Sequence, residues 1–599
     1  MDAKVSCRCG NAKIPTQCCL LKITSKPWSG NSKKVTIENA CILLKQALNQ
    51  RNFILVQTIS NSILSKVANH PVVHYVVAMQ YFLQGQHQSA KTSIQFAFAN
   101  GLQDANAYLQ YANLVGQEGN YHAALKSLEL ALQIKPDFAP ALTMGFQISM
   151  LIQQFEQAIH FAKSLLKINA QNCHYYVFLA EAYSKNLQDD LALIVIEQGL
   201  EIETNNSPLL LLKVGILELN NKLDQAQALL QSVLLKSPEE IDALLLQAKL
   251  LIRQKQVSKA KEILLELVEN PNCSAEQIQS AHASLVNANR ALGCYKAAWQ
   301  NAEQMNSLTA KIRPNSGEWS EVETYFTQIE QAANSLNSPF NLALENSNQF
   351  LFIVGFPRSG STLLEKLLYE RFQSFSVGES NAIPELEKEV FLRFDKPWWQ
   401  LNDSEWNNPQ LLKHVEKALD VYKNQGWQSD SPLIDKNLLN STRLILLDKL
   451  FPDAPIIKLV RHPLDVLVSN FVTHFGSNDA WHSNLEITAK YMLKVDEHWH
   501  SVSRKLHNPV YTIHYESIIN NQGIPNELNS FLEHYWPAKT RPVNTQDITQ
   551  FVTRTASYAQ VQQNINTESL NSYKHYLDSI PKDIINIIRP IAERWNYII

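Results

Sequence analysis

Apolar and small residues follow different patterns in the two halves of the chain. Between about residues 36 and 310 the pattern is helical, and one small residue returns every 34 positions. The series is Ala90, Ala124, Ala158, Ala192, Ala226 and Ala260, with Ala298 following after 38 positions (298 minus 260). A helix pair of this length cannot bury its own apolar face, so several pairs must stack. The pattern predicts an all-α solenoid of about seven repeats.

The second half instead contains short apolar runs that lead directly into polar or small residues. One run spans Phe350 to Val354, and others end at Asp435, Val460 and Tyr515. Short apolar runs bounded by turn residues are typical of strands buried in a parallel sheet. We therefore expect an α/β domain with a central parallel sheet over residues 350–599, joined to the solenoid by a linker at 311–349 that contains one short helix.

A loop of small residues, Gly355 to Thr362, follows the first run and precedes a Leu-rich helix. A strand, a loop and a helix in this order direct backbone N–H groups and the positive helix end at one anion. Gly355 and Gly360 have the spacing of a phosphate loop, but Ser361 replaces the lysine that nucleotide triphosphatases require. Arg358 adds a planar fork of donors for a phosphate or sulfate group. The alternative is a tight turn without a ligand.

The segment from Gly355 to Leu364 resembles the 5′-phosphosulfate loop of sulfotransferases that use 3′-phosphoadenosine-5′-phosphosulfate (PAPS). It is similar to tyrosylprotein sulfotransferases and to bacterial proteins that join such a domain to tetratricopeptide repeats, whose period is about 34 residues. The resemblance covers about residues 346–599, and the upstream repeats fit the bacterial arrangement. It implies a P-loop-like domain that transfers the sulfuryl group of PAPS to a hydroxyl and releases adenosine 3′,5′-bisphosphate.

The resemblance also implies two catalytic roles in addition to that of Arg358. Glu379 is the expected base for the acceptor hydroxyl, although this chain has Ser380 where tyrosylprotein enzymes carry their second glutamate. Another carboxylate such as Glu385 is the alternative base. Lys436 is the expected cation that stabilises the bridging oxygen as it leaves the sulfur. A helix-capping glutamate and a solvated surface lysine are the structural alternatives.

Further residues are expected to bind the nucleotide. Those assigned to the 5′-phosphosulfate are Arg358, Ser359, Gly360, Ser361 and Thr362. Arg461 and Ser469 lie eight positions (469 minus 461) or two helical turns apart, and in the family such a pair binds the 3′-phosphate. Tyr515 matches a family tyrosine at the nucleotide phosphate, and Ser557 lies in a segment that resembles a late substrate and nucleotide loop. ATP has no 3′-phosphate, so this second anion site would distinguish PAPS from ATP.

Four of the eight cysteines, Cys7, Cys9, Cys18 and Cys19, lie within the first nineteen residues. Their spacing resembles the SEC-C zinc motif, C-x-C-x8-C-C. Eight residues between the pairs allow a hairpin that surrounds a tetrahedral zinc with four thiolates. We expect residues 1–22 to form this motif; a cluster of reactive thiols without metal is the alternative.

Composition narrows the class of protein. A chain of 599 residues is too long for one core, and 45% apolar with 18% charged residues is typical of a soluble globular protein. The net charge of −3 gives no sign of a nucleic-acid or membrane surface. Neither a membrane-length apolar run nor a signal-peptide core is present, so we expect a cytoplasmic protein without membrane or nucleic-acid partners.

The sequence therefore predicts a PAPS-dependent sulfotransferase whose repeats present a protein or peptide acceptor, tyrosine-like in character. The repeats could instead be an interdomain scaffold or an oligomerisation arm. Two other functions remain open: a P-loop kinase of a small molecule, disfavoured by Ser361, and a repeat adaptor that binds a nucleotide without turnover.

Overall fold

The structure is a computed structural model. It describes residues 36–312, 319–333, 344, 347–428, 431–475, 481–539, 558 and 564–599. By its internal packing the chain divides into two compact units, residues 1–182 and 183–599.

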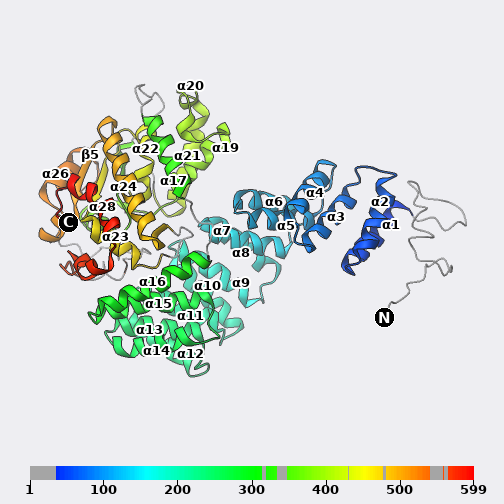
Figure 1. Cartoon of the computed structure of the whole chain (residues 1–599), viewed down its shortest axis with the longest axis horizontal. Helices are drawn as coiled ribbons and strands as arrows, with labels where there is room; N and C mark the ends of the chain where they lie inside the picture. The colour runs from blue at the N-terminus through cyan, green and yellow to red at the C-terminus, as the bar shows by residue number, and fades with distance from the viewer. Residues whose placement is uncertain are drawn as a thin grey trace, which may run out of the picture. The chain divides into compact units, whose positions relative to one another are not determined.

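The first unit is built from consecutive helix pairs (Figure 1). Its helices are α1 (Ile37–Asn49), α2 (Phe53–Leu64), α3 (Pro71–Leu83), α4 (His87–Ala99), α5 (Ala105–Gln117), α6 (Tyr121–Ile134), α7 (Ala139–Leu151) and α8 (Phe155–Ile168), and α9 (Cys173–Lys185) spans the division. Ala90, Ala124 and Ala158 are fully buried, which lets the helices of a pair approach closely. A Cβ at Gly145 would lie 2.7 Å from the Phe161 ring, so this close approach requires glycine.

The second unit begins with further helix pairs of the same period. They are α10 (Asp189–Ile202), α11 (Ser207–Leu219), α12 (Leu223–Leu234), α13 (Ile241–Arg253), α14 (Val257–Glu269), α15 (Ala275–Ala291) and α16 (Tyr295–Ile312). Ala192, Ala226, Ala260 and Ala298 are fully buried. α15 has 17 residues where α11 and α13 have 13, so the four-residue insertion before Ala298 lengthens α15 by one turn.

The last repeat shares a hydrophobic cluster with the sheet that follows it. Trp299 of α16 packs on Phe471 with ring centroids 4.7 Å apart, and the Asn306 amide donates a hydrogen bond to the Phe471 carbonyl oxygen at 2.9 Å. α17 (Trp319–Ala333) adds Phe326 and Ile329 to the same cluster. This helix lies within the predicted linker, 311–349. The linker and the other predicted domain boundaries stay predictions.

A parallel sheet of five strands forms the core of the carboxy-terminal part. The strands are β1 (Phe350–Val354), β2 (Phe375–Ser376), β3 (Leu433–Asp435), β4 (Ile456–Val460) and β5 (Val510–His514), in the order β2-β3-β1-β4-β5. β1 is central, and the strand order reverses beside it. In such sheets ligands bind at this switch point, beyond the carboxyl ends of the strands.

Helices cover both faces of the sheet, which explains why its central strand, β1, is continuously apolar. Phe350, Phe352 and Val354 of β1 enter the cluster that includes α16 and α17, whereas Leu351 and Ile353 enter the opposite one. The helices of this part are α18 (Ser361–Arg371), α19 (Ala382–Phe394), α20 (Asp403–Trp406), α21 (Pro409–Asn424), α22 (Leu444–Leu450), α23 (Pro463–Phe471), α24 (Leu485–Val502), α25 (Tyr515–Asn520), α26 (Asn526–Tyr535) and α28 (Lys582–Arg594). The predicted fold class, a repeat solenoid followed by an α/β domain, is confirmed.

Within the described ranges, no helix is long and apolar enough to cross a membrane.

Candidate functional site

The loop from Gly355 to Gly360 connects β1 to α18 at the switch point of the sheet. A Cβ at Gly355 would lie 2.9 Å from the Leu459 carbonyl oxygen, so glycine allows the loop to run close to β4. Arg358 adopts a positive φ of 70°, which is uncommon outside glycine and often marks a functional loop. Gly360 has a φ of 99°, and its Cβ would lie 2.2 Å from the Tyr515 ring. Two separate constraints therefore fix glycine at position 360.

The loop and the start of α18 have the features of an anion cradle. Gly360 is the N-cap of α18 and supplies no side-chain cap for the first turn. The Ser359 hydroxyl is buried and has no hydrogen-bond partner among the described residues. Buried polar groups are rarely left unpaired, and helix N-termini attract anions. The local structure therefore suits a bound phosphate or sulfate group.

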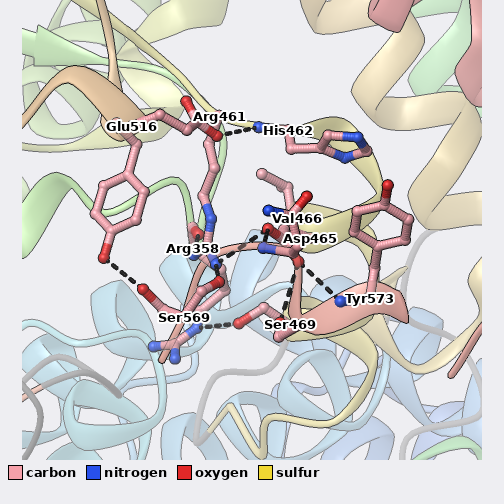
Figure 2. A network of polar contacts seen from close by, with 12 residues as sticks. Arg358, Arg461, His462, Asp465, Val466, Ser469, Glu516, Ser569 and Tyr573 are labelled. Atoms are coloured by element: carbon pink, nitrogen blue, oxygen red, sulfur yellow. Dashed lines mark hydrogen bonds and ion pairs between the residues drawn. The ribbon is translucent and has the colours of Figure 1, made fainter. Parts of the chain in front are cut away.

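Arg358 of this loop and Arg461, which follows β4, lie next to each other (Figure 2). Arg358 Nε donates to Ser469 Oγ at 3.1 Å, and Arg461 Nη1 donates to the Arg358 carbonyl oxygen at 3.1 Å. The Arg461 guanidinium also lies 4.7 Å from the centre of the Tyr515 ring. Four residues predicted to bind the nucleotide, Arg358, Arg461, Ser469 and Tyr515, thus each contact at least one of the others.

The environment of these guanidinium groups favours an incoming anion. Burial lowers the pKa of Arg358 to about 10, and the positive charges of Arg290 and Arg461 contribute to this shift. Arg461 Nε is buried without a hydrogen-bond partner in the described part of the chain. An anion placed here would relieve the repulsion between like charges and supply the missing acceptor.

The segment after residue 564 closes one side of the site. Arg461 Nη2 donates to the Ser569 carbonyl oxygen at 2.5 Å, and the Ser569 hydroxyl lies 2.8 Å from the Tyr515 hydroxyl. Asp465 of α23 accepts hydrogen bonds from the backbone N–H groups of Asn571 at 2.8 Å and Tyr573 at 2.9 Å. Asp465 therefore anchors this segment against the helix that follows Arg461 (Figure 2).

A second group of charges lies at the carboxyl end of β3. Lys436 is fully buried, and its Nζ lies 2.8 Å from Glu379 Oε1 and 3.5 Å from Glu365 Oε2. Glu379 is half-exposed, with 54% of its side-chain area accessible, whereas Glu365 is buried and accepts a hydrogen bond from Ser376 Oγ at 2.6 Å. Of these two carboxylates, only Glu379 combines contact with Lys436 and access from outside, as a base for a bound acceptor requires.

The charges of Lys436, Glu379 and Glu365 and the charges of the loop influence each other. Burial opposes the charge of Lys436, but the charges of Glu379 and Glu365 outweigh it and raise the pKa of Lys436. Burial raises the pKa of Glu365, and the charge of Lys436 opposes this shift. The Glu379 charge acts on Arg358 in the direction that raises its pKa. The predicted catalytic residues therefore share one electrostatic environment.

Asp435, the last residue of β3, should give the domain a pH-dependent stability. Its carboxylate is fully buried and accepts hydrogen bonds from Tyr422 Oη at 2.5 Å and the Asn437 N–H at 2.9 Å. Burial raises the pKa of Asp435 to about 6, whereas an unfolded aspartate has a pKa of about 3.9. The folded state keeps its proton over this interval, so stability should fall as the pH rises from about 4 to about 6.

We expect this loss to reach about 3 kcal/mol, because one pKa unit corresponds to about 1.4 kcal/mol. Asp435→Asn cannot titrate and should lack this part of the pH dependence. Denaturation midpoints measured between about pH 4 and pH 7 check the prediction, with Asp420→Asn at an exposed aspartate as the matched control. Parallel pH profiles for wild type and Asp435→Asn would contradict it.

The remaining predicted residues fall into two groups. Ser361 and Thr362 are the first residues of α18, and Glu385, the alternative base, lies on α19 with its carboxylate 3.0 Å from Lys388 Nζ. The other group lies outside the described residues: Ser557 and the four cysteines, Cys7, Cys9, Cys18 and Cys19. In the described part of the chain, no three His, Cys, Asp or Glu residues form a possible metal site.

Two residues of this site, Arg290 and Glu365, were not predicted from the sequence. The positive charge of Arg290 acts on Arg358, and Arg290 lies near the end of the lengthened helix α15. The four-residue insertion in the repeats was the only sequence feature that set this helix apart. Glu365 is the buried second partner of Lys436, three positions beyond Thr362 in the loop helix. The spacing of Glu365 within a Leu-rich helix does not mark it as a site residue. Its burial beside Lys436, which only the structure reveals, does so.

Comparisons with known proteins match two parts of the chain. Residues 351–527 match the model of the family described as "Sulfotransferase family", and residues 217–285 match a tetratricopeptide repeat model. An uncharacterized protein of Aquifex aeolicus (strain VF5) is 25% identical over 246 residues, which cover 38% of this chain and 31% of that protein. The chain thus matches less than a third of the length of this curated relative.

Solved structures resemble the repeats. A tetratricopeptide repeat protein from Parabacteroides merdae ATCC 43184 is 13% identical with a TM-score of 0.37, covering 40% of this chain and 93% of that chain. A thermophilic TPR protein from Thermus thermophilus is 20% identical with a TM-score of 0.27, covering 30% and 99%. With scores this low, the assignment of the repeats rests on their period and on the family match. The chain therefore carries a sulfotransferase family domain, matched over residues 351–527, together with tetratricopeptide repeats.

Proposed function

We propose that this protein transfers the sulfuryl group of PAPS to a hydroxyl on a protein or peptide, with the repeats binding that acceptor. The hydrogen bond from the Arg461 guanidinium to the Arg358 carbonyl oxygen, which brings a second arginine to the phosphate-type loop, is the observation that carries the proposal. A donor with a 5′-phosphosulfate and a 3′-phosphate supplies two anionic groups for this site. The sulfotransferase family match supports the reaction type, and the repeats support a macromolecular acceptor.

In this proposal the loop amides, Arg358 and Ser359 bind the 5′-phosphosulfate. Arg461 and Ser469 bind the 3′-phosphate. When the nucleotide binds, the hydrogen bond from Arg358 to Ser469 therefore breaks, or the Ser469 hydroxyl contacts both Arg358 and the phosphate. Glu379 takes the acceptor proton, and the oxygen attacks sulfur while the bond to the phosphate oxygen breaks. Lys436 stabilises the charge on that leaving oxygen. Positioning and charge stabilisation supply most of the acceleration, as in phosphoryl transfer.

Nucleotide binding tests the proposal directly. Adenosine 3′,5′-bisphosphate should bind at least about tenfold more tightly than 5′-AMP, because losing a charge-assisted partner costs about 1.5–3 kcal/mol. Calorimetric titration of both ligands and of ATP gives the comparison. Ser469→Ala and Arg461→Gln should reduce the preference for the bisphosphate, whereas Arg393→Gln at an exposed arginine should not. Equal affinities of wild type for the bisphosphate and 5′-AMP would refute the second anion site.

A further inference from the structure

A carboxylate is buried in the repeats of the second unit, far from the nucleotide loop in sequence. Glu218 lies near the end of α11, and its side chain is fully buried. Arg253 Nη1 lies 2.5 Å from Glu218 Oε1, and Lys249 Nζ lies 2.8 Å from Glu218 Oε2. Both cations come from α13, the helix one 34-residue period after α11. We call these three residues the Glu218 cluster.

Burying this carboxylate has a cost that two cations only partly offset. Arg253 is oriented by a second bond, from Nη2 to Asn221 Oδ1 at 2.7 Å. Lys249 keeps 40% of its side-chain area accessible and Arg253 keeps 15%, so the cations border the surface while the carboxylate lies beneath it. A buried acceptor under a rim of cations is suited to a ligand that carries both a hydrogen-bond donor and an electron-rich face.

Tyr558 of the same chain provides both of these features. Its hydroxyl donates a hydrogen bond to Glu218 Oε1 at 2.7 Å, across 340 positions of sequence. Its ring centre lies 5.3 Å from Lys249 Nζ and 5.5 Å from the Arg253 guanidinium carbon, within the range of cation–π attraction. Burial raises the pKa of Tyr558, so the phenol remains neutral and keeps its proton for Glu218.

We propose that the Glu218 cluster is a tyrosine-binding site on the repeats, filled by Tyr558 in the free protein and open to tyrosyl side chains of other proteins. The hydroxyl proton is the selective element. Phenylalanine cannot donate to Glu218, and a sulfated tyrosine has lost the proton and would place an anion against the carboxylate. The site therefore distinguishes an unmodified tyrosine from a sulfated one. Phenol binding does not depend on the proposed reaction, whereas selection of the unsulfated acceptor rests on it.

Removing the internal occupant provides the test. We use the full chain without PAPS and follow NMR titrations of N-acetyl-tyrosinamide, N-acetyl-phenylalaninamide and the sulfated tyrosinamide. Tyr558→Ala should bind N-acetyl-tyrosinamide at least about tenfold more tightly than wild type and at least about tenfold more tightly than either analogue, since only the phenol restores a partner to the buried Glu218 acceptor. Tyr535→Ala, which removes an exposed tyrosine elsewhere, should behave as wild type.

Two further variants assign the binding to the cluster. Adding Glu218→Gln to Tyr558→Ala should abolish the preference for the tyrosine amide over the phenylalanine amide. Adding Lys249→Met leaves the buried carboxylate with Arg253 and should weaken binding of both amides while preserving the preference. The proposal is overturned if Tyr558→Ala binds the tyrosine amide no better than wild type, or binds both amides equally. Bisphosphate affinity, measured in parallel, tests the proposed function separately.

Discussion

Replacing Glu379 by glutamine should lower the rate of sulfuryl transfer by about two to four orders of magnitude, the usual contribution of a positioned general base. The amide keeps the shape of the side chain and its contact with Lys436, now 2.8 Å from Glu379 Oε1, but it cannot take a proton. Adenosine 3′,5′-bisphosphate should bind without loss of affinity, because the groups proposed to hold it, Arg358, Arg461 and Ser469, are unchanged and the substitution only removes a negative charge near Arg358. Single-turnover transfer to a phenol, compared with calorimetric affinity, separates the two effects.

Two other carboxylates serve as controls for this assignment. Glu385 is paired with Lys388 on α19, so Glu385→Gln should retain most of the transfer activity. Glu365→Gln removes a buried carboxylate beside Lys436 and should reduce activity less than Glu379→Gln. If Glu379→Gln keeps more than about a tenth of the wild-type rate while Glu385→Gln does not, Glu385 is the base and the reaction class survives.

The fold could be predicted from sequence because each of its two signals is local and repeated. The alanines at a 34-residue period are fully buried, since only a small side chain fits where paired helices touch. The apolar run from Phe350 to Val354 coincides with β1, because a central parallel strand is covered on both faces and needs no polar residue. The packing of α16 against Phe471 could not be predicted, because it joins residues that no periodicity connects.

The loop of the candidate site can be recognised in the sequence by its spacing, whereas the other expected site residues came from the family resemblance. Gly355, Arg358 and Gly360 stand out because the turn after β1 constrains their backbone. The bond from Arg358 to Ser469 joins residues 111 positions apart, and the sequence placed them on two different phosphates. The contact between Tyr558 and Glu218 crosses even more of the chain. Such pairs depend on tertiary packing, and a single sequence contains no signal for it.

Replacing Lys436 by methionine should affect both stability and transfer. Lys436 is fully buried between Glu379 and Glu365, and methionine preserves much of its length without the charge. Glu365 would then remain buried without its cation, and breaking a buried pair in this way costs about 3–5 kcal/mol. Because burial already raises the pKa of Glu365, this loss should be greatest at high pH and shrink as the carboxylate takes up a proton.

The double variant Lys436→Met/Glu365→Gln separates the two effects. Replacing the stranded carboxylate by an amide should restore most of the stability, measured as the denaturation midpoint at about pH 8, where the carboxylate would be charged. Transfer should stay reduced by about a hundredfold to a thousandfold, as for the loss of a donor at a developing oxyanion, because neither substitution supplies a cation for the leaving oxygen. Recovery of transfer together with stability would mean that Lys436 only supports the fold. Loss of transfer in a stable double variant would leave charge stabilisation as its role.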